Sequence, residues 1–262
     1  MRFAVTEDCV ECTTPKIVET PGTYEASLAL IKDSVKELAG DQPIKAMVGG
    51  IAGTFDDDKS TLVRAPHLQD WVGKSIKKDF EEIAGAPVEI DNDTAVISLG
   101  EALAGAGRGY DIVAYMTVST GVGGSRVVDG KMDEKSQSFE VGHQIIDDDE
   151  GKTLEQLVSG TAMKERFGKE GYEIEDPEIW AELTKELAVG VHNTLLHWSP
   201  DVLVLGGSMV TGKGPCFDIE ALKKEVNELS PLMANFEIKK AELGDLNGIY
   251  GALEWAKQLH HE

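Results

Sequence analysis

Hydrophobic side chains along the first ninety residues alternate between a strand-like and a helix-like spacing. Short apolar runs at 1–5, 16–20 and 44–48 predict strands. Apolar positions three and four residues apart predict amphipathic helices over 23–38 and 71–84, each stopped by a glycine. Because strands and helices alternate, this part of the chain predicts an α/β arrangement.

The rest of the chain continues this alternation. Strands are expected at 112–118, 125–128 and 201–205. Helices are expected at 153–167, 178–197, 219–229 and 249–259. The run 201–205 is apolar at almost every position, which predicts a strand buried on both faces. Since strands in both halves lead into glycine-rich turns, we expect two related α/β lobes around a cleft.

A polar triplet, Asp91-Asn92-Asp93, follows an apolar run that starts at Val88 and precedes a helix expected over 94–103. Such a triplet usually caps the N-terminus of the helix. Two later segments favour a second interpretation, namely the glycine-rich stretch 119–124 and the Glu/His pair in 140–143. A carboxylate, a glycine-rich turn and a Glu/His pair, in that order, are the parts of a phosphoryl-transfer site.

Charge and cysteine content restrict the classes of function. The 262 residues include 47 acidic and 25 basic side chains, a formal net charge of -22. This excess argues against nucleic acid, anionic membrane surfaces and long polyanions as partners, although it also serves solubility. No apolar run has the length of a membrane span and no signal pattern opens the chain, so a cytoplasmic location is expected. Cys9 and Cys12 have CxxC spacing, but no second pair completes a zinc site, and the odd total with Cys216 implies no disulfide framework.

A series of segments matches, in order, the motifs of one known family. They are Gly50–Asp56, Ala65–Trp71, Ile90–Ala95, Gly100–Gly109, Thr117–Gly124, Glu140–His143, Leu154–Gly160, Val204–Ser208 and Leu243–Ala252. Together these segments resemble the ROK family of sugar kinases (repressor, open reading frame, kinase). That family lies within the superfamily of acetate and sugar kinases, heat-shock ATPases and actin. The resemblance covers nearly the whole chain, and its strength comes from the number and order of the motifs.

The resemblance implies a two-lobed actin-like ATPase fold, related to ribonuclease H, with a central cleft. Residues 1–92 would form a small α/β lobe, completed by a C-terminal helix at 249–262, and residues 93–248 a large α/β lobe. The implied activity is ATP- and Mg²⁺-dependent phosphorylation of a hexose, glucose or a related sugar, at a primary hydroxyl. The implied partners are a small-molecule sugar and a nucleotide, with no nucleic acid and no membrane, and the chain is expected to form a homodimer.

The resemblance also assigns the site residues. Asp93 would act as general base, since a positioned carboxylate can take the proton of a sugar hydroxyl, help worth about 10²–10⁴-fold. The residues expected to bind the sugar are Ala52, Gly53, Asn92, Glu140, His143 and Glu155. Those expected to bind the nucleotide are Thr120, Gly121, Gly123, Gly124, Gly206 and Gly207. By spacing alone, an ordinary surface or core histidine is the favoured interpretation of His143, and a plain hairpin that of the glycine stretch; the family resemblance reverses the preference for His143.

Two departures from the family pattern matter. Family members usually carry a cysteine-rich zinc loop between the Glu/His pair and the next glutamate, and here residues 144–153 contain no cysteine. No structural zinc is therefore expected, and the acidic run 147–150 should form a short solvated turn. The family also opens with a strand and a phosphate-facing D-x-G-G-T-K turn. Met1 resembles the start of the next strand, so we expect the small lobe to lack its first strand because the start codon is set too late.

The favoured interpretation is a glucokinase-like kinase, and three alternatives remain. The first is a non-catalytic sugar-binding or regulatory protein, because the phosphate-facing turn is missing. The repressor branch is disfavoured, since no helix-turn-helix segment precedes the kinase part and acidity opposes DNA binding. A polyphosphate-using glucokinase also lacks the zinc loop, but a polyphosphate track needs clustered Lys and Arg, which the chain does not show.

Overall fold

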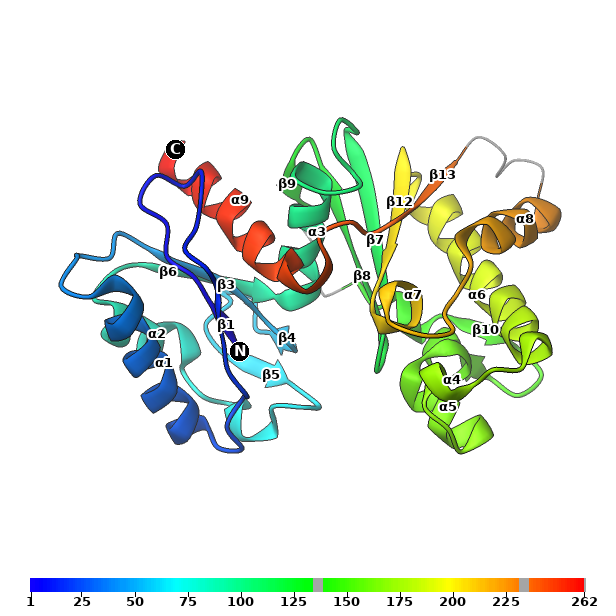
Figure 1. Cartoon of the computed structure of the whole chain (residues 1–262), viewed down its shortest axis with the longest axis horizontal. Coiled ribbons are helices and arrows are strands. Elements are labelled where there is room, and N and C mark those ends of the chain that lie inside the picture. The colour runs from blue at the N-terminus through cyan, green and yellow to red at the C-terminus, as the bar shows by residue number, and fades with distance from the viewer. Residues whose placement is uncertain (134–138, 231–235, 262) are drawn as a thin grey trace. The chain divides into compact units, whose positions relative to one another are not determined.

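The structure is a computed structural model that describes residues 1–133, 139–230 and 236–261 (Figure 1). Contacts between residues divide the chain into two compact units. The first unit comprises Met1–Gly100 with Asp245–Glu262, and the second comprises Glu101–Gly244. The lobe assignment of 1–92 with 249–262, and of 93–248, stays a proposal.

The first unit is built around two parallel strands, β3 (Met47–Ile51) and β6 (Val88–Asn92). Their register pairs Met47 with Val88 and Ile51 with Asn92, so both strands end at the same edge. Two short antiparallel pairs accompany them, β1 (Arg2–Phe3) with β2 (Lys16–Ile17) and β4 (Thr54–Phe55) with β5 (Leu62–Arg64). The helices of this unit are α1 (Tyr24–Ala39), α2 (Ile76–Ala84), the first part of α3 (Asp93–Leu103), and α9 (Asn247–His261).

Three aromatic rings organise the core of the first unit. Trp71 makes edge-on contacts with Tyr24, at 5.1 Å between ring centroids, and with Phe80, at 6.2 Å. These geometries are the ones aromatic pairs prefer. The Tyr24 hydroxyl donates to Asp79 at 2.7 Å, so its one polar atom is satisfied inside the core. Aliphatic side chains of Leu62, Ile76, Val88 and Ile90 complete the cluster.

The second unit contains a five-stranded mixed sheet in the order β13-β12-β7-β8-β9. The strands are β7 (Ile112–Val118), β8 (Val122–Val128), β9 (Lys131–Met132), β12 (Val202–Gly206) and β13 (Glu237–Lys240). β12 runs parallel to β7 and β13, while β7, β8 and β9 are antiparallel neighbours. Every residue of β12 is buried, as the uninterrupted apolar run predicts.

Helices pack on this sheet and enclose the larger core. They are α4 (Leu154–Val158), α5 (Gly160–Phe167), α6 (Pro177–Trp198), α7 (Ser208–Thr211) and α8 (Ile219–Leu229). Figure 1 shows α4, α6 and α8 on one side of the sheet. Leu183, Leu187, Val191 and Leu195 of α6 are fully buried. Their spacing of four residues is part of the pattern that predicts this helix.

Several predicted element boundaries are wrong, each for a local reason. The helix expected from residue 71 begins at Ile76, because a 3₁₀ turn (Gln69–Trp71) and Gly73, at φ +77°, precede it. The strand expected at 44–48 is β3 and extends to Ile51. The helix expected over 153–167 is two helices, α4 and α5, broken at Ser159, whose backbone is extended.

The strands expected at 1–5 and 16–20 are confined to two residues each, in β1 and β2. The strand expected from residue 125 begins at Val122, so Gly123 and Gly124 lie inside β8 and not in a turn. The turn that joins β7 to β8 is therefore shorter than the glycine content suggests.

Candidate active site

Asn92 ends β6 and caps α3. Its Oδ1 accepts hydrogen bonds from the backbone N–H of Thr94, at 2.9 Å, and of Ala95, at 3.3 Å. The capping interpretation of the polar triplet is thus correct for this residue. Its Nδ2 donates to the carbonyl oxygen of Gly53 at 2.9 Å. One amide therefore joins the start of α3 to the loop that follows β3.

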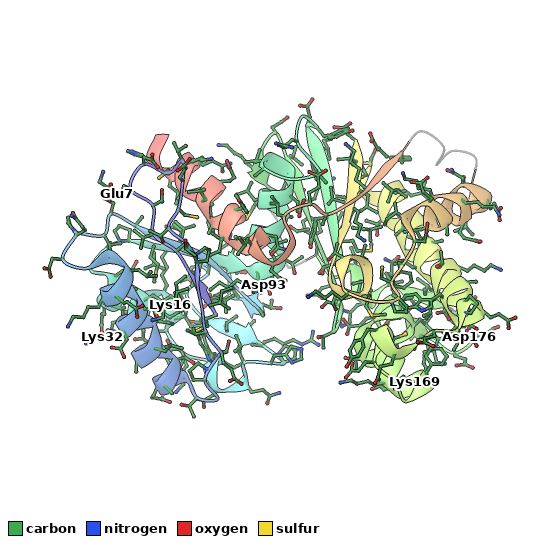
Figure 2. The ribbon with its side chains drawn as sticks, in the orientation of Figure 1. Glu7, Lys16, Lys32, Asp93, Lys169 and Asp176 are labelled. Atoms are coloured by element: carbon green, nitrogen blue, oxygen red, sulfur yellow. The ribbon has the colours of Figure 1, made fainter. Side chains whose placement is uncertain are left out.

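Asp93 is the first residue of α3 and lies next to this cap (labelled in Figure 2). Its Oδ1 accepts the backbone N–H of Thr94 at 2.8 Å and lies 3.4 Å from the Thr94 hydroxyl. Burial raises the pKa of the Asp93 carboxyl above its usual value, while the hydrogen bonds from Thr94 act in the opposite direction. In the described part of the chain no other residue donates to Oδ2. The site thus holds a positioned carboxylate with one oxygen available.

The loop after β3 has a shape that only glycine adopts without strain. Gly53 has φ +143°, and a Cβ atom there would lie 2.6 Å from the carbonyl oxygen of Arg64. Ala52 precedes it and follows the last residue of β3, Ile51, which pairs with Asn92. The structure thus brings four predicted site residues together at the carboxyl ends of β3 and β6, where open α/β sheets commonly bind ligands. They are Ala52, Gly53, Asn92 and Asp93.

An ion pair next to this group is not predicted from the sequence. The carboxylate of Asp91 is 5% exposed and lies 2.6 Å from Nζ of Lys59. Its other oxygen accepts the backbone N–H of Asn92 at 2.7 Å. Lys59 lies in the β4–β5 loop and has φ +56°. In sequence, the run Asp56-Asp57-Asp58-Lys59 is typical of a solvated charge cluster, and the one signal it offers is that a cation directly follows three aspartates.

In the second unit, the turn between β7 and β8 comprises Ser119, Thr120 and Gly121. It is closed by the hydrogen bond from Ser119 N–H to the carbonyl oxygen of Gly121 at 2.8 Å. Thr120 and Gly121 thus occupy the turn, as expected. Gly123 and Gly124 instead pair with Thr117 and Met116 of β7.

Packing accounts for the glycine at position 124. A Cβ atom on Gly124 would lie 2.7 Å from Cγ2 of Val141 and 3.2 Å from the ring of Trp198. The missing side chain lets Val141 reach the sheet and enter the core. A nucleotide role for Gly123 and Gly124 stays a prediction, and the packing against Val141 and Trp198 gives Gly124 a structural reason of its own.

Glu155 joins α4 to this turn. Its Oε2 accepts the backbone N–H of Val122 at 2.8 Å. A Cβ atom on Gly121 would lie 2.5 Å from the same oxygen, so a side chain there would displace the carboxylate from its present position. The predicted sugar ligand Glu155 is thus adjacent to the predicted phosphate turn.

The Glu/His pair lies on a 3₁₀ turn, Val141–His143. Nδ1 of His143 lies 3.2 Å from Oε2 of Glu140, and both side chains are about half exposed, at 48%. The next residue, Gln144, fixes the segment to α6. Its amide donates to the carbonyl oxygens of Val141 and Gly190 and accepts from Asn193 at 3.1 Å. No sequence motif marks Gln144.

Gly206 and Gly207 end β12, directly beside the Ser119–Gly121 turn. Gly207 has φ +90°, and any side chain there would collide with the carbonyl oxygen of Val118. Ser119 Oγ lies 3.1 Å from Oγ of Ser208. Because β7 and β12 are parallel, both glycine turns lie at carboxyl ends of strands, as in the first unit.

The predicted site residues thus form two groups, one in each unit. The group in the second unit comprises Glu140, His143, Glu155, Thr120, Gly121, Gly123, Gly124, Gly206 and Gly207. Where the family carries its zinc loop, β10 (Ile145–Asp147) and β11 (Lys152–Thr153) form a hairpin. Its exposed turn is stabilised by the backbone N–H groups of Asp149 and Glu150, which donate to Asp147.

Within 1–133, 139–230 and 236–261, no group of three or more His, Cys, Asp or Glu side chains is arranged to hold a metal ion. Over the same ranges, no helix combines the length and the apolar character needed to cross a bilayer.

Solved structures show the same fold. The ROK hexokinase from Thermus thermophilus superposes with a TM-score of 0.81 at 22% identity, over 97% of this chain and 94% of that one. The ROK glucokinase from Streptomyces griseus, in complex with glucose and AMPPNP, gives 0.74 at 23% identity, over 97% and 95%. A ROK transcriptional regulator, described as a homolog of E. coli MLC protein, gives 0.79 at 18%, over 98% and 75%. The expected actin-like ATPase fold class is confirmed.

Sequence relatives identify the family. The chain is 27% identical over 256 residues to the uncharacterized protein CPE0188 from Clostridium perfringens, covering 87% of this chain and 85% of that one. It is 32% identical over 205 residues to a fructokinase from Zymomonas mobilis, covering 71% and 67%. A sequence model of the ROK family matches residues 1–259. The chain therefore belongs to the ROK family.

Proposed function

We propose that this ROK protein is a sugar kinase that transfers the terminal phosphoryl group of ATP to the primary hydroxyl of a hexose, glucose or a related sugar. The observation that carries the proposal is Asp93, a carboxylate held at the start of α3 with one oxygen available. The similarity to a fructokinase over most of the chain supports sugar phosphorylation in general. The choice of glucose and of Asp93 as base is our own.

In the proposed reaction Asp93 accepts the proton of the sugar hydroxyl as that oxygen attacks phosphorus. A carboxyl with a raised pKa is a better proton acceptor once ionised than an ordinary one, and burial provides this increase. The Thr94 backbone N–H holds Oδ1 and so fixes the direction of Oδ2. The protein thus supplies orientation and proton removal, while the γ-phosphorus of ATP is the electrophile and ADP is the leaving group.

Asn92 has restricted options for binding a sugar. Its Oδ1 already accepts two backbone N–H groups, and one hydrogen of Nδ2 is used by the Gly53 carbonyl. An amide carries two N–H donors, so one remains for a sugar hydroxyl oxygen. We therefore assign Asn92 a donor role, with Glu140, Glu155 and His143 as acceptors from other hydroxyl groups of the sugar.

For the nucleotide we propose the turn that carries Thr120 and Gly121, together with Gly206 and Gly207. Backbone N–H groups in such turns bind phosphate oxygens without a charged side chain. ATP is the donor to test first, because the Streptomyces griseus glucokinase, which has the same fold, was solved with AMPPNP. Gly123 and Gly124 would contribute through the strand that follows the turn.

Magnesium fits the residues present. Mg²⁺ in kinases is bound chiefly by phosphate oxygens and water, with one or two carboxylates from the protein. The proposed enzyme therefore needs no preformed cluster of three ligands, and the described residues contain none. Bound to ATP, the ion would neutralise charge on the phosphates. Among the proposed site residues of the first unit, Asp93 is the one that carries a carboxylate.

The variant Asp93→Asn tests the assignment of the base. It keeps the size of the side chain and an acceptor for the Thr94 N–H but removes the proton acceptor. We expect the rate of ATP-dependent sugar phosphorylation to fall by about 10²–10⁴-fold, with glucose binding still measurable by calorimetry. The matched control is Asp33→Asn, at an exposed position of α1, which should keep the wild-type rate. Near-wild-type turnover of Asp93→Asn would show that another group is the base.

The second candidate function is a non-catalytic sugar-binding or regulatory protein. The fold allows it, since one similar structure is a ROK transcriptional regulator. A wild-type protein that binds glucose but forms no sugar phosphate from ATP would favour this candidate over the kinase.

A further inference from the structure

The two oxygens of the Glu155 carboxylate have different surroundings. Oε2 accepts the Val122 N–H at 2.8 Å and lies over the Cα of Gly121. No residue in the described part of the chain donates to Oε1. The side chain is half-buried, and only one of its two carboxylate oxygens, Oε2, has a hydrogen-bond donor among the described residues.

Glu155 belongs to a corner between α4 and α5 that holds the Ser119–Gly121 turn along its length. The Gly160 N–H donates to the Ser119 carbonyl at 2.7 Å. The backbone N–H of Thr161 donates to the Thr120 carbonyl at 3.1 Å, and the Thr161 hydroxyl donates to the same oxygen at 2.8 Å. Residues 155–161 thus make three hydrogen bonds to the turn and a fourth to Val122, the residue directly after it.

This corner is itself fixed in place. The Thr153 hydroxyl accepts the backbone N–H of Gln156, and the Gln156 side chain accepts the N–H of Thr153, a reciprocal cap at the start of α4. Leu154 is fully buried beside Glu155. The main chain that carries Glu155 therefore has little freedom, and the carboxylate moves by rotation of its own side chain.

Resting on the proposed function, we propose that Glu155 couples the binding of sugar to the binding of nucleotide. Oε2 holds the nucleotide turn through Val122, and Oε1 accepts a hydroxyl of the sugar. A bound sugar prevents the carboxylate from rotating away from Val122, so the turn is better ordered when the nucleotide arrives. By thermodynamic linkage, the nucleotide raises the affinity for sugar by the same factor.

The test is the dissociation constant of AMPPNP measured by calorimetry with and without saturating glucose. For the wild type we expect glucose to tighten AMPPNP binding by about 5-fold or more, within the usual range of such couplings. Glu155→Asp keeps the charge but is one methylene shorter, so it can reach Val122 or the sugar but not both. Its coupling factor should fall to about 1-fold, the value of uncoupled sites.

Two matched variants isolate the bridging role. Glu140→Asp shortens another proposed sugar ligand, which pairs with His143 and makes no hydrogen bond to the turn within the described residues, so it should weaken glucose binding and keep the coupling factor. Glu155→Gln has two polar atoms at the same reach, one to accept from Val122 and one to bind the sugar, and should also keep it. A coupling factor that is unchanged in Glu155→Asp, or lost equally in Glu140→Asp, overturns the proposal.

Thr161→Val gives a second readout that does not depend on Glu155. It removes the hydroxyl bond to Thr120 and keeps the backbone bond, so AMPPNP should bind more weakly both with and without glucose, at an unchanged ratio. Thr184→Val removes a similar hydroxyl bond within α6 and should change neither constant. A wild type that binds both ligands without coupling overturns this inference alone. A wild type that binds neither ligand overturns the proposed function as well.

Discussion

The Nδ2 atom of Asn92 donates to the carbonyl oxygen of Gly53 at 2.9 Å, while the Oδ1 atom of the same amide caps α3. One side chain thus fixes both the start of the helix that carries Asp93 and the loop that follows β3. Because both ends of the amide are in use, the identity of this residue is restricted to asparagine.

Asn92→Asp should separate these two roles. Aspartate keeps the helix cap but has no donor for the Gly53 carbonyl, and it places a charge against that oxygen. We expect the free energy of unfolding to fall by about 1–3 kcal/mol and the KM for sugar to rise. Chemical denaturation and steady-state kinetics measure both. Unchanged stability and KM would show that the bond to Gly53 is dispensable.

Gly53→Ala should strain the same loop. Alanine at φ +143° costs on the order of 1–3 kcal/mol, and its Cβ would lie 2.6 Å from the Arg64 carbonyl oxygen, which is backbone. The matched control is Gly49→Ala in β3, where a Cβ meets nothing within 4 Å. The control should leave stability unchanged or raise it by up to about 1 kcal/mol. Equal effects of the two substitutions on the melting temperature would contradict the strain.

Lys59→Met should expose the dependence of Asp91 on its ion pair. The variant leaves a carboxylate that is 5% exposed without the ammonium 2.6 Å away. We expect a loss of about 1–3 kcal/mol in the free energy of unfolding. Lys32→Met, at an exposed position of α1 labelled in Figure 2, is the control and should change stability little. If both variants unfold at the same denaturant concentration as the wild type, the pair contributes nothing.

The raised pKa of Asp93 predicts a pH effect of defined sign. A carboxyl whose pKa is higher in the folded state binds more protons when folded, so this group makes the protein less stable as pH rises from below its ordinary value through the raised one. Asp93→Asn removes the effect. The variant should therefore be more stable than the wild type at neutral pH, and the difference should shrink in acid. A variant less stable at neutral pH and equally so in acid would contradict the burial effect.

Zinc content can be measured on the wild type. Residues 144–153 contain no cysteine, and the β10–β11 hairpin is stabilised by backbone bonds to Asp147 and by the Gln144 amide. We expect less than one zinc per chain by elemental analysis, and no change in melting temperature with a chelator. Stoichiometric zinc that stabilises the fold would disprove this.

Local patterns predict the elements whose cause is local. The cap at Asn92, the buried strand β12 and the long helix α6 all follow from residue type and spacing within a few positions. The break at Ser159 is different, because its one local signal, the Ser159-Gly160 pair, does not by itself say where the chain turns. There the chain turns so that Gly160 can bind the Ser119 carbonyl, a contact forty-one residues away in sequence.

The site shows the same division. The order of the motifs identifies Asp93, Glu155 and the glycine turns as candidate site residues. It also predicts that Gly124 lies in a turn, whereas Gly124 lies in β8 and packs against Val141. The sequence does not predict the roles of Lys59 and Gln144, because each binds a partner that is distant in the sequence. Lys59 pairs with Asp91, and Gln144 donates to Gly190 of α6. Long-range packing, which no local pattern records, decides these positions.

The most direct test of the proposed function is phosphoryl transfer itself, followed by ³¹P NMR with ATP, Mg²⁺ and one sugar at a time. We predict a hexose phosphate signal with glucose or a related hexose, none with 6-deoxyglucose, which lacks the primary hydroxyl, and a loss of the signal in Asp93→Asn. If the wild type forms no sugar phosphate with glucose, fructose or mannose, or if Asp93→Asn forms it at the wild-type rate, the account of this protein as a sugar kinase with Asp93 as its base is contradicted.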